Sequence, residues 1–389
     1  VLRIEKIGVH DNFFKLGGDS IISIQLVAKA RKKGIHFAVK DVFNYSTIAG
    51  LSLILATKAA QENPLALNSL DRKPEQGLVK GDIPLTPIQH WFFEGNLANK
   101  NHYNQASLLQ VSATLDPSIL KKTFEFLINN HDVLRCCYIE DDTTKSWKQT
   151  NLTMVTDDKK NIAGAFSKGI SCIWTNIDLS NLKAEELSVR IEQESNILQQ
   201  SLNIKNGPLI KVALFDCGAE VAARLLIVIH HLVVDGVSWR ILLEDLEHVY
   251  KTLENGRELP MLTKTHSYQQ WSHALASYAK SSELEKQIPY WQKVQESVMQ
   301  LQLPVDFDKD TDSDFSNAII LSLTAEETTA LLQRVPKAYR TQINDILLTA
   351  LTLAIGDWTK QYSLGLSLEG HGREDIIPGI DTSRTIGWF

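Results

Sequence analysis

A polar stretch without hydrophobic periodicity, at residues 59–81, constrains the fold of this chain more than any other feature. It is punctuated by residues that interrupt helices and strands, namely Pro64, Asn68, Pro74 and Gly77. Such stretches join domains, because few contacts cross them. A chain of 389 residues has room for about two to three domains. We therefore predict a small domain at residues 1–58, a linker at residues 59–81 and a larger domain at residues 82–389.

The two predicted domains differ in fold class. Residues 1–58 carry apolar residues at helical spacing after Ser20, and a second short helix is expected from Thr47, so this domain is predicted to be all-α. In the larger domain, strands and helices alternate without a repeat, which indicates an α/β or α+β fold. Its clearest elements are strands expected at residues 221–229 and 363–369 and helices expected at residues 238–255 and 341–358.

Composition excludes several classes of protein. Lys and Arg total 40 against 46 Asp and Glu, and the net charge of −6 is spread along the chain without the basic stripe of a nucleic-acid-binding protein. A hydrophobic content of 43% supports a packed core, and no apolar run approaches the ~18 residues of a membrane span. The N-terminus lacks a signal-peptide pattern, and the cysteines lack metal-binding spacing. We therefore expect a cytoplasmic protein with no metal site, no membrane contact and no nucleic-acid partner.

The run DNFFKLGGDS at residues 11–20 places a serine at the start of an amphipathic helix. Two glycines permit a tight turn, and an anion attached to Ser20 would meet free backbone N–H groups and the positive end of the helix dipole. Taken alone, Gly-Gly-Asp-Ser is more typical of an ordinary helix N-cap. The full run, however, closely resembles the modification site of peptidyl carrier domains from nonribosomal peptide synthetases. This resemblance implies that a phosphopantetheinyl transferase attaches a 4′-phosphopantetheine arm to Ser20, and that the thiol of the arm holds an acyl chain as a thioester.

A second run, HHLVVDGVSW at residues 230–239, starts with two adjacent histidines. Because side chains alternate along a strand, only one of them can face a given cavity, and the other must pack into the scaffold. The run resembles the HHxxxDG motif of the condensation-domain superfamily. The resemblance implies that His231 is catalytic and His230 supporting, and that Asp235, with Gly236, holds the turn.

The superfamily includes both condensation and epimerization domains, and further runs resemble the epimerization branch. The most informative is EGHGRE at residues 369–374, which matches a motif of epimerization domains. A carrier with aspartate rather than histidine before the serine is also the form usually found upstream of such a domain. The other runs are PIQHWF at residues 87–92, DILLTA at residues 345–350 and RTIGWF at residues 384–389. The resemblance implies L-to-D epimerization of an aminoacyl or peptidyl thioester held by the chain's own carrier domain.

The residue types fit that chemistry. Inverting an α-carbon requires one group that removes a proton and another that returns a proton from the opposite face. A histidine such as His231 exchanges protons near neutral pH. Glu369, at the end of an expected strand, is followed by glycines that permit close approach to a substrate. His371 and Arg373 are expected to be supporting residues, which could order the loop, contact the phosphate of the arm or support Glu369.

The resemblance also implies the architecture and the partners. The carrier is expected to be an incomplete four-helix bundle with its first helix largely missing. The larger domain is expected to have two α/β lobes of the chloramphenicol-acetyltransferase type, the first at about residues 82–260 and an incomplete second at about residues 261–389. An upstream adenylation domain and a downstream condensation domain are implied partners. Two other functions stay open: a condensation domain that forms amide bonds, and a non-catalytic module that docks carrier domains.

Overall fold

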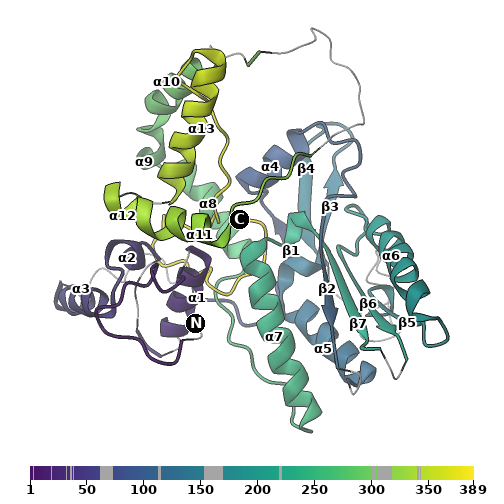
Figure 1. Cartoon of the computed structure of the whole chain (residues 1–389). Helices are drawn as coiled ribbons and strands as arrows, with labels where there is room; N and C mark the ends of the chain where they lie inside the picture. Colours follow the sequence, from purple (N-terminus) through teal and green to yellow (C-terminus); the bar gives the residue numbers. More distant parts are fainter. Residues whose placement is uncertain are drawn as a thin grey trace. The chain divides into compact units, whose positions relative to one another are not determined.

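Strands and helices alternate from β1 (Gly81–Ile83) to α7 (Gly236–Glu254), as the sequence predicts, whereas the described elements after α7 are all helices (Figure 1). The structure is a computed structural model, and it describes all residues except 3, 19, 32, 36, 38, 62–72, 113–114, 153–169, 219–220, 300–302, 305–317, 340 and 342. It divides into two compact units. The first contains Val1–Ala279 and His371–Phe389, and the second contains Lys280–Gly370. The division therefore falls after Ala279 rather than near residue 260, and the last 19 residues belong with the first unit.

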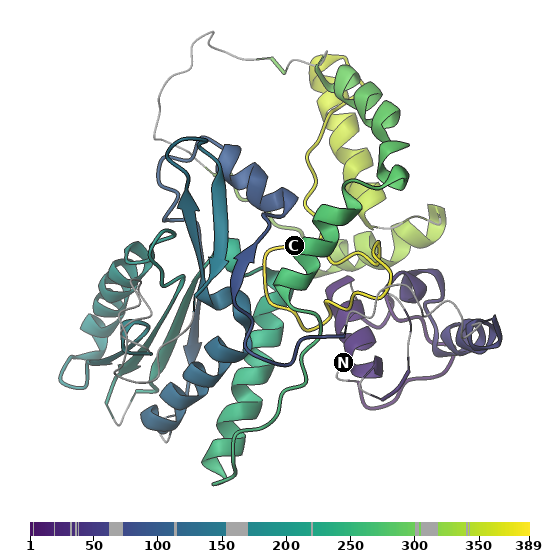
Figure 2. The same ribbon diagram turned by 180° about the vertical axis from the view of Figure 1, so that it is seen from behind.

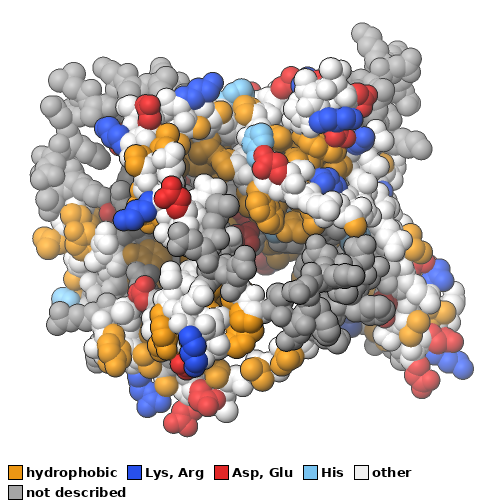
Figure 3. Space-filling view, turned by 90° about the horizontal axis from the view of Figure 1, so that it is seen from above, with side chains coloured by type: hydrophobic (Ala, Val, Ile, Leu, Met, Phe, Trp, Pro, Cys, Tyr) orange, Lys and Arg blue, Asp and Glu red, His pale blue; other side chains and the backbone are white. Residues whose placement is uncertain are grey.

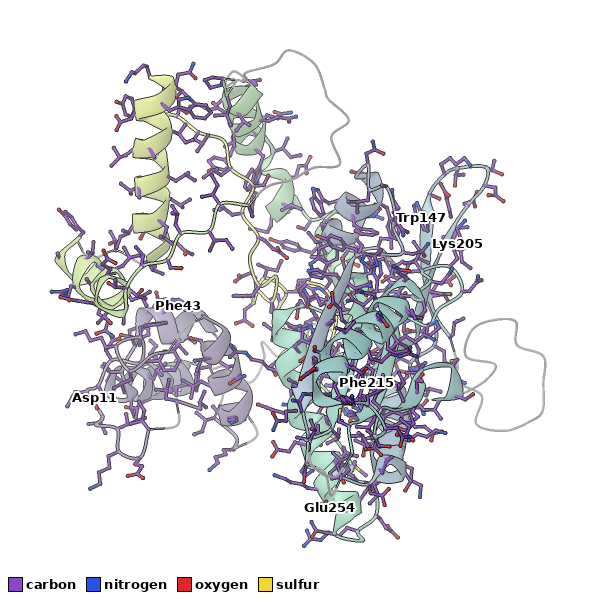
Figure 4. All side chains as sticks on the ribbon, turned by 45° about the vertical axis from the view of Figure 1, so that its right-hand side comes forward. Asp11, Phe43, Trp147, Lys205, Phe215 and Glu254 are labelled. Atoms are coloured by element: carbon purple, nitrogen blue, oxygen red, sulfur yellow. The ribbon has the colours of Figure 1, made fainter. Side chains whose placement is uncertain are left out.

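Three helices lie in the region predicted to be a small helical domain, which confirms its all-α class. They are α1 (Ser20–Arg31), α2 (Val39–Asn44) and α3 (Ile48–Gln61). Apolar residues of these helices and of the segments beside them form a core that contains Phe13, Val27, Phe37 and Val42. Phe43, labelled on α2 in Figure 4, lies with its ring 4.9 Å from the ring of Phe14. The run that precedes Ser20 is therefore packed against the helices by its aromatic side chains.

The main sheet of the larger domain has four strands. In spatial order they are β2 (Asn104–Gln110), β7 (Arg224–His230), β6 (Ile210–Asp216) and β5 (Trp174–Asp178). β7 is antiparallel to both of its neighbours, with Asn104 opposite His230, while β5 and β6 are parallel. The strand predicted at residues 221–229 is thus confirmed as a central strand. Central strands buried on both faces are typically continuous apolar runs, as residues 225–229 are.

Helices cover both faces of this sheet. Alternate residues of β7 point to opposite sides: Ile227 belongs to the core that includes α5 (Pro117–Asn130) and α7 (Gly236–Glu254), whereas Val228 belongs to the core under α6 (Ala184–Gln200). Figures 1 and 2 show α5 and α7 side by side along one face and α6 along the other. Phe215, labelled in Figure 4, is fully buried in the layer under α6. The helix predicted at residues 238–255 is confirmed as α7.

A smaller sheet and short helices complete the first unit. The sheet pairs β4 (Trp147–Asn151) with β1 (Gly81–Ile83) on one side and with β3 (Cys136–Glu140) on the other, both antiparallel. The helices are α4 (Pro87–Glu94), α8 (Tyr268–Tyr278) and the 3-10 helix η2 (Asp132–Arg135). No helix in the described part of the chain is long and apolar enough to cross a membrane. On the face seen in Figure 3, acidic and basic side chains are scattered among apolar ones.

The second half of the predicted linker is fixed to the first unit. The side chain of Gln270 hydrogen-bonds the backbone of Lys73, and Gln269 donates to the carbonyl oxygens of Lys80 and Asp82. Lys264 donates through Nζ to the Gly77 carbonyl oxygen at 2.7 Å. Helix α3 also extends to Gln61, inside the range predicted as linker. Residues 62–72 lie outside the described residues.

The second unit is helical within the residues that the structure describes. Its elements are α9 (Ser282–Glu285), α10 (Ile288–Met299), α11 (Ala325–Thr329), the π-helix η5 (Ala330–Arg334), α12 (Val335–Tyr339) and α13 (Ile343–Thr359). The helix predicted at residues 341–358 is confirmed as α13, which lies beside α10 in both ribbon views (Figures 1 and 2). The strand predicted at residues 363–369 is wrong: these residues form no strand. An alternating apolar pattern becomes a strand only when another strand pairs with it, and the described residues of this unit offer none.

Candidate active site

The two adjacent histidines lie where strand β7 ends and helix α7 begins. β7 ends at His230, a 3-10 turn spans His231–Val233, and α7 begins at Gly236. The apolar run before His230 favours a buried strand, and Asp235 then begins a helix as its N-cap. His230 is therefore the last residue of the strand, and His231 is the first residue of the turn.

His230 is held by the scaffold through both ring nitrogens. It is fully buried, its Nε2 lies 2.9 Å from the Lys100 carbonyl oxygen, and its Nδ1 accepts a hydrogen bond from the Leu232 N–H. This pattern assigns the ring proton to Nε2. Burial lowers the pKa of His230 to about 4, so the imidazole is neutral at pH 7. These contacts give His230 a part in holding the turn, in keeping with the supporting role expected from the sequence.

His231 has one ring nitrogen that no described residue hydrogen-bonds. Its backbone N–H donates to the Tyr103 carbonyl oxygen at 2.7 Å, and its Nδ1 lies 2.9 Å from the Val234 carbonyl oxygen. Because a carbonyl oxygen can only accept, Nδ1 carries the proton and Nε2 carries the lone pair in the neutral ring. The side chain is partly exposed. His231 therefore presents Nε2 as a proton acceptor, which is the arrangement that a general base requires.

Asp235 joins the two runs that most resemble catalytic motifs. One of its carboxylate oxygens accepts from the Ser238 N–H at 2.7 Å, which caps α7. Both carboxylate oxygens accept from one guanidinium nitrogen of Arg373, at 3.1 and 3.2 Å. Gly236 follows at the first position of α7, where an added Cβ would meet no atom within 4 Å. Asp235 thus holds the turn by capping α7 and by pairing with Arg373. At Gly236, in contrast, the space around the residue does not require glycine.

Arg373 is buried, with 2% of its side chain exposed. Besides Asp235, it donates to the carbonyl oxygens of Thr382 and Thr385 and to Ser238 Oγ, and its guanidinium carbon lies 3.8 Å from the ring centroid of Phe389. Burial lowers the pKa of Arg373 from its usual range, opposed by the Asp235 carboxylate. Of the three roles considered for Arg373, ordering the loop matches these contacts, because a side chain so enclosed cannot reach a phosphate.

His371 and Gly372 shape the backbone before Arg373. His371 Nδ1 accepts from the Arg373 N–H at 3.1 Å, and its Nε2 lies 3.4 Å from a carboxylate oxygen of Glu374. Gly372 has a φ of +65°, and a Cβ added there would lie 2.1 Å from the carbonyl carbon of Phe389. Only glycine fits both the left-handed conformation and the close approach.

Glu369 is exposed and belongs to the second compact unit, whereas His231 belongs to the first. The structure therefore does not define a joint site for these two residues. It brings together His230, His231, Asp235 and Arg373, with His371 on the same loop as Arg373.

Three neighbours of His231 were not predicted as site residues, although Val234 and Trp388 lie inside runs that resemble family motifs. Tyr103 and Trp388 place their rings beside the imidazole, and the Val234 carbonyl sets its tautomer. Trp388 lies inside the RTIGWF run, so that run was the one signal that pointed to it. No run of the sequence that resembles a motif contains Tyr103. Within the described residues, no cluster of three or more His, Cys, Asp or Glu side chains could hold a metal ion.

Ser20 is the first residue of α1, as the sequence predicts, while its side chain and Asp19 lie outside the described residues. The turn before it contains Gly17, with a φ of +89°, and Gly18, where an added Cβ would lie 2.4 Å from the ring of Phe13. The turn therefore requires both glycines and directs the chain into a 12-residue helix at Ser20. A phosphate group at that position fits the helix, because the positive end of the helix dipole favours an anion there.

Comparisons with known proteins identify the family. The condensation-domain family matches residues 79–389, and the phosphopantetheine attachment site family matches residues 1–55. A linear gramicidin synthase of Brevibacillus parabrevis is 44% identical over all of this chain, and surfactin synthase subunit 1 of Bacillus subtilis (strain 168) is 39% identical. The chain spans 7% and 10% of the lengths of these two relatives.

Solved structures agree with this assignment. The epimerization domain from the third module of tyrocidine synthetase B is 37% identical, with a TM-score of 0.69 over 82% of this chain and 67% of that one. The first condensation domain of the calcium-dependent antibiotic synthetase, at 19% identity and a TM-score of 0.58, covers 79% of this chain and 67% of that one and shares the fold. The chain therefore belongs to the condensation-domain family, and it joins a carrier domain that takes a covalent 4′-phosphopantetheine to a condensation-superfamily domain of a nonribosomal peptide synthetase.

Proposed function

We propose that this chain interconverts the L and D forms of an aminoacyl or peptidyl thioester carried on the phosphopantetheine arm of Ser20. The observation that carries the proposal is the ion pair between Arg373 and Asp235, because it joins the EGHGRE run to the HHxxxDG run. Glu369 stands four residues before Arg373, and four residues span at most about 14 Å. Because Glu369 and Arg373 belong to the same EGHGRE run, this ion pair supports a role for Glu369 in the same reaction. The 37% identity to a solved epimerization domain supports the choice of reaction.

The thioester of the arm makes the proton on the α-carbon acidic enough to be removed. In the L-to-D direction, one of the two groups, His231 Nε2 or the Glu369 carboxylate, takes this proton, and the electron pair of the broken C–H bond stays on the α-carbon and its carbonyl group. The other group, protonated, then gives a proton to the opposite face of the same carbon. The two groups exchange roles for the reverse direction. Val234 keeps His231 Nε2 available by holding the proton on Nδ1.

The neighbouring domains follow from the same proposal. An adenylation domain upstream would select and load the amino acid, and a condensation domain downstream would take the D product. A phosphopantetheinyl transferase would convert the chain to its active form, and a cytoplasmic location suits these partners. The relatives are themselves much longer than this chain, which spans 7% and 10% of their lengths, in keeping with such neighbours.

The test loads Ser20 with L- or D-aminoacyl phosphopantetheine in heavy water and follows both the L/D ratio and α-deuterium content. Glu369→Gln and His231→Ala should each abolish inversion in both directions, because a complete turnover needs both groups. Each variant should still exchange the α-proton of the one enantiomer that faces its remaining group. Asp375→Asn on the same loop and His248→Ala on α7, both exposed residues, serve as matched controls and should invert normally.

Two results would contradict the proposal. Near-normal inversion by Glu369→Gln would show that the glutamate is only part of the loop. Amide bond formation with an acceptor carrier, in the absence of any α-proton exchange, would assign the chain to condensation instead. A chain that binds loaded carriers but does neither reaction would be a docking module.

A further inference from the structure

The indole ring of Trp388 lies against the imidazole of His231. The two ring centroids are 4.3 Å apart, and Trp388 is 1% exposed. Tyr103 contacts both: its ring stacks on His231 at 5.3 Å, with an interplanar angle of 16°, and lies 5.8 Å from the ring of Trp388. The imidazole is therefore in contact with two aromatic rings that also contact each other.

The backbone around Trp388 is fixed from both sides. Ser238 Oγ donates to the Gly387 carbonyl oxygen at 2.9 Å and accepts from the Gly387 N–H at 3.0 Å. The Tyr268 hydroxyl donates to the Trp388 carbonyl oxygen at 2.6 Å. A Cβ on Gly387 would lie 2.3 Å from the ring of Tyr268, so this approach requires glycine. The position of the indole is thus set by α7 and α8.

Arg384, at the start of the same RTIGWF run, is held as well. Its guanidinium group pairs with Glu244 at 3.0 Å and with Asp245, whose other carboxylate oxygen lies 3.1 Å from His131 Nε2. Both ends of the run are therefore attached to α7, the helix that follows the histidine turn. Because α7 follows the histidine turn directly and carries these anchors, and α8 holds the Trp388 carbonyl group, Trp388 is fixed relative to His231.

We propose that Trp388 is a positioning residue for His231, which rests on the proposed role of His231 as a base or acid. The hydrogen bond from Nδ1 to Val234 fixes the tautomer, but a single hydrogen bond lets the ring pivot about it. The rings of Trp388 and Tyr103 block that pivot and hold Nε2 in one direction. A base must be aligned with the proton it takes, so the loss of this support lowers the rate more than it lowers substrate binding.

The test compares Trp388→Leu and Trp388→Phe with Trp271→Leu. Trp271 is also buried, at 3% exposed, and it packs against Phe389 rather than His231. Trp271→Leu therefore removes the same side-chain volume as Trp388→Leu without removing a contact with His231. We expect Trp388→Leu to lower kcat on the order of 10- to 100-fold with KM changed much less, as small misplacements of a reacting group do. Trp388→Phe should recover part of the loss, and Trp271→Leu should keep its kcat per folded molecule.

A second measurement does not depend on turnover. NMR spectra are recorded with ¹³C at the ring Cε1 of every histidine. The resonance that is absent from the spectrum of His231→Gln is assigned to His231 and reports the environment of its ring. It should move in Trp388→Leu and stay in place in Trp271→Leu. A folded Trp388→Leu protein with an unmoved resonance and a normal kcat would overturn the inference. If the unsubstituted protein exchanges no α-proton, the proposed function fails, and the resonance alone decides whether Trp388 positions His231.

Discussion

Replacing Asp235 by asparagine tests whether the ion pair with Arg373 serves the fold or the chemistry. Asparagine keeps a side-chain oxygen that can cap α7, because Asn and Asp are comparable N-cap residues. It removes the negative charge that faces the buried guanidinium group. The change therefore isolates the charge of the pair from the helix cap.

The expected cost follows from burial. The side chain of Arg373 is 2% exposed and that of Asp235 is 12% exposed, so water cannot replace the lost carboxylate. Removing one partner of a buried ion pair costs about 3–5 kcal/mol. We expect about 3 kcal/mol here, since asparagine still accepts one hydrogen bond, and this corresponds to about two powers of ten in the unfolding equilibrium. Turnover per folded molecule should fall by less than that.

The assay is urea unfolding followed by the fluorescence of the buried tryptophans, with turnover measured on the folded fraction. Glu247→Gln breaks the exposed pair with Lys251 and is the control, for which little change in midpoint is expected. The double variant with Arg373→Met should be more stable than the sum of the single losses predicts, because no unpaired cation remains. Additive losses, within about 0.5 kcal/mol, would refute the pairing argument. An equally stable but inactive Asp235→Asn would move Asp235 into the chemistry.

Three further predictions concern other parts of the chain. Ser20→Ala should block the mass increase that a phosphopantetheinyl transferase and coenzyme A produce; a modified variant would show that Ser20 is not the attachment residue. Since burial lowers the pKa of His230 from 6.5 to about 4, the unfolded chain binds the proton more tightly, so stability present above pH 6.5 should be lost as the pH falls toward 4. In His230→Gln, the pH dependence of the unfolding free energy in that window should be shallower by up to about 1.4 kcal/mol per pH unit, and an unchanged slope in urea titrations would contradict this. Gln269→Ala should speed tryptic cleavage after Lys80 about tenfold, because two hydrogen bonds hold that segment, while Gln193→Ala, on the exposed face of α6, should not.

Local sequence patterns predicted the elements that carry the histidine turn. Residues 225–229 are continuously apolar and form the central strand, and the alternation rule separated His230 from His231. The glycines before Ser20 and the helix that starts there were also predictable, because each depends on a few adjacent residues. In each of these cases the physical cause lies within about one turn of helix or one strand.

Long-range partners could not be predicted in the same way. Arg373 hydrogen-bonds Asp235 at a sequence separation of 138 residues, and Ser238 hydrogen-bonds Gly387 at a separation of 149 residues. Nothing in the local pattern of either partner encodes the other. The expected strand that ends at Glu369 fails for the same reason, since its alternating pattern describes one face of a strand and says nothing of what would pair with it.

The two histidines show how a fold gives adjacent, identical residues different roles. His230 ends the β7 ladder opposite Asn104, and there both of its ring nitrogens meet backbone groups, so the ring is locked and neutral. One residue later the chain leaves the ladder, and only Nδ1 of His231 meets a carbonyl group. The difference is made by the register of the strand and the position of the turn, not by the side chains. A one-residue shift of that register would put His231 opposite Asn104, where both of its ring nitrogens would meet backbone groups.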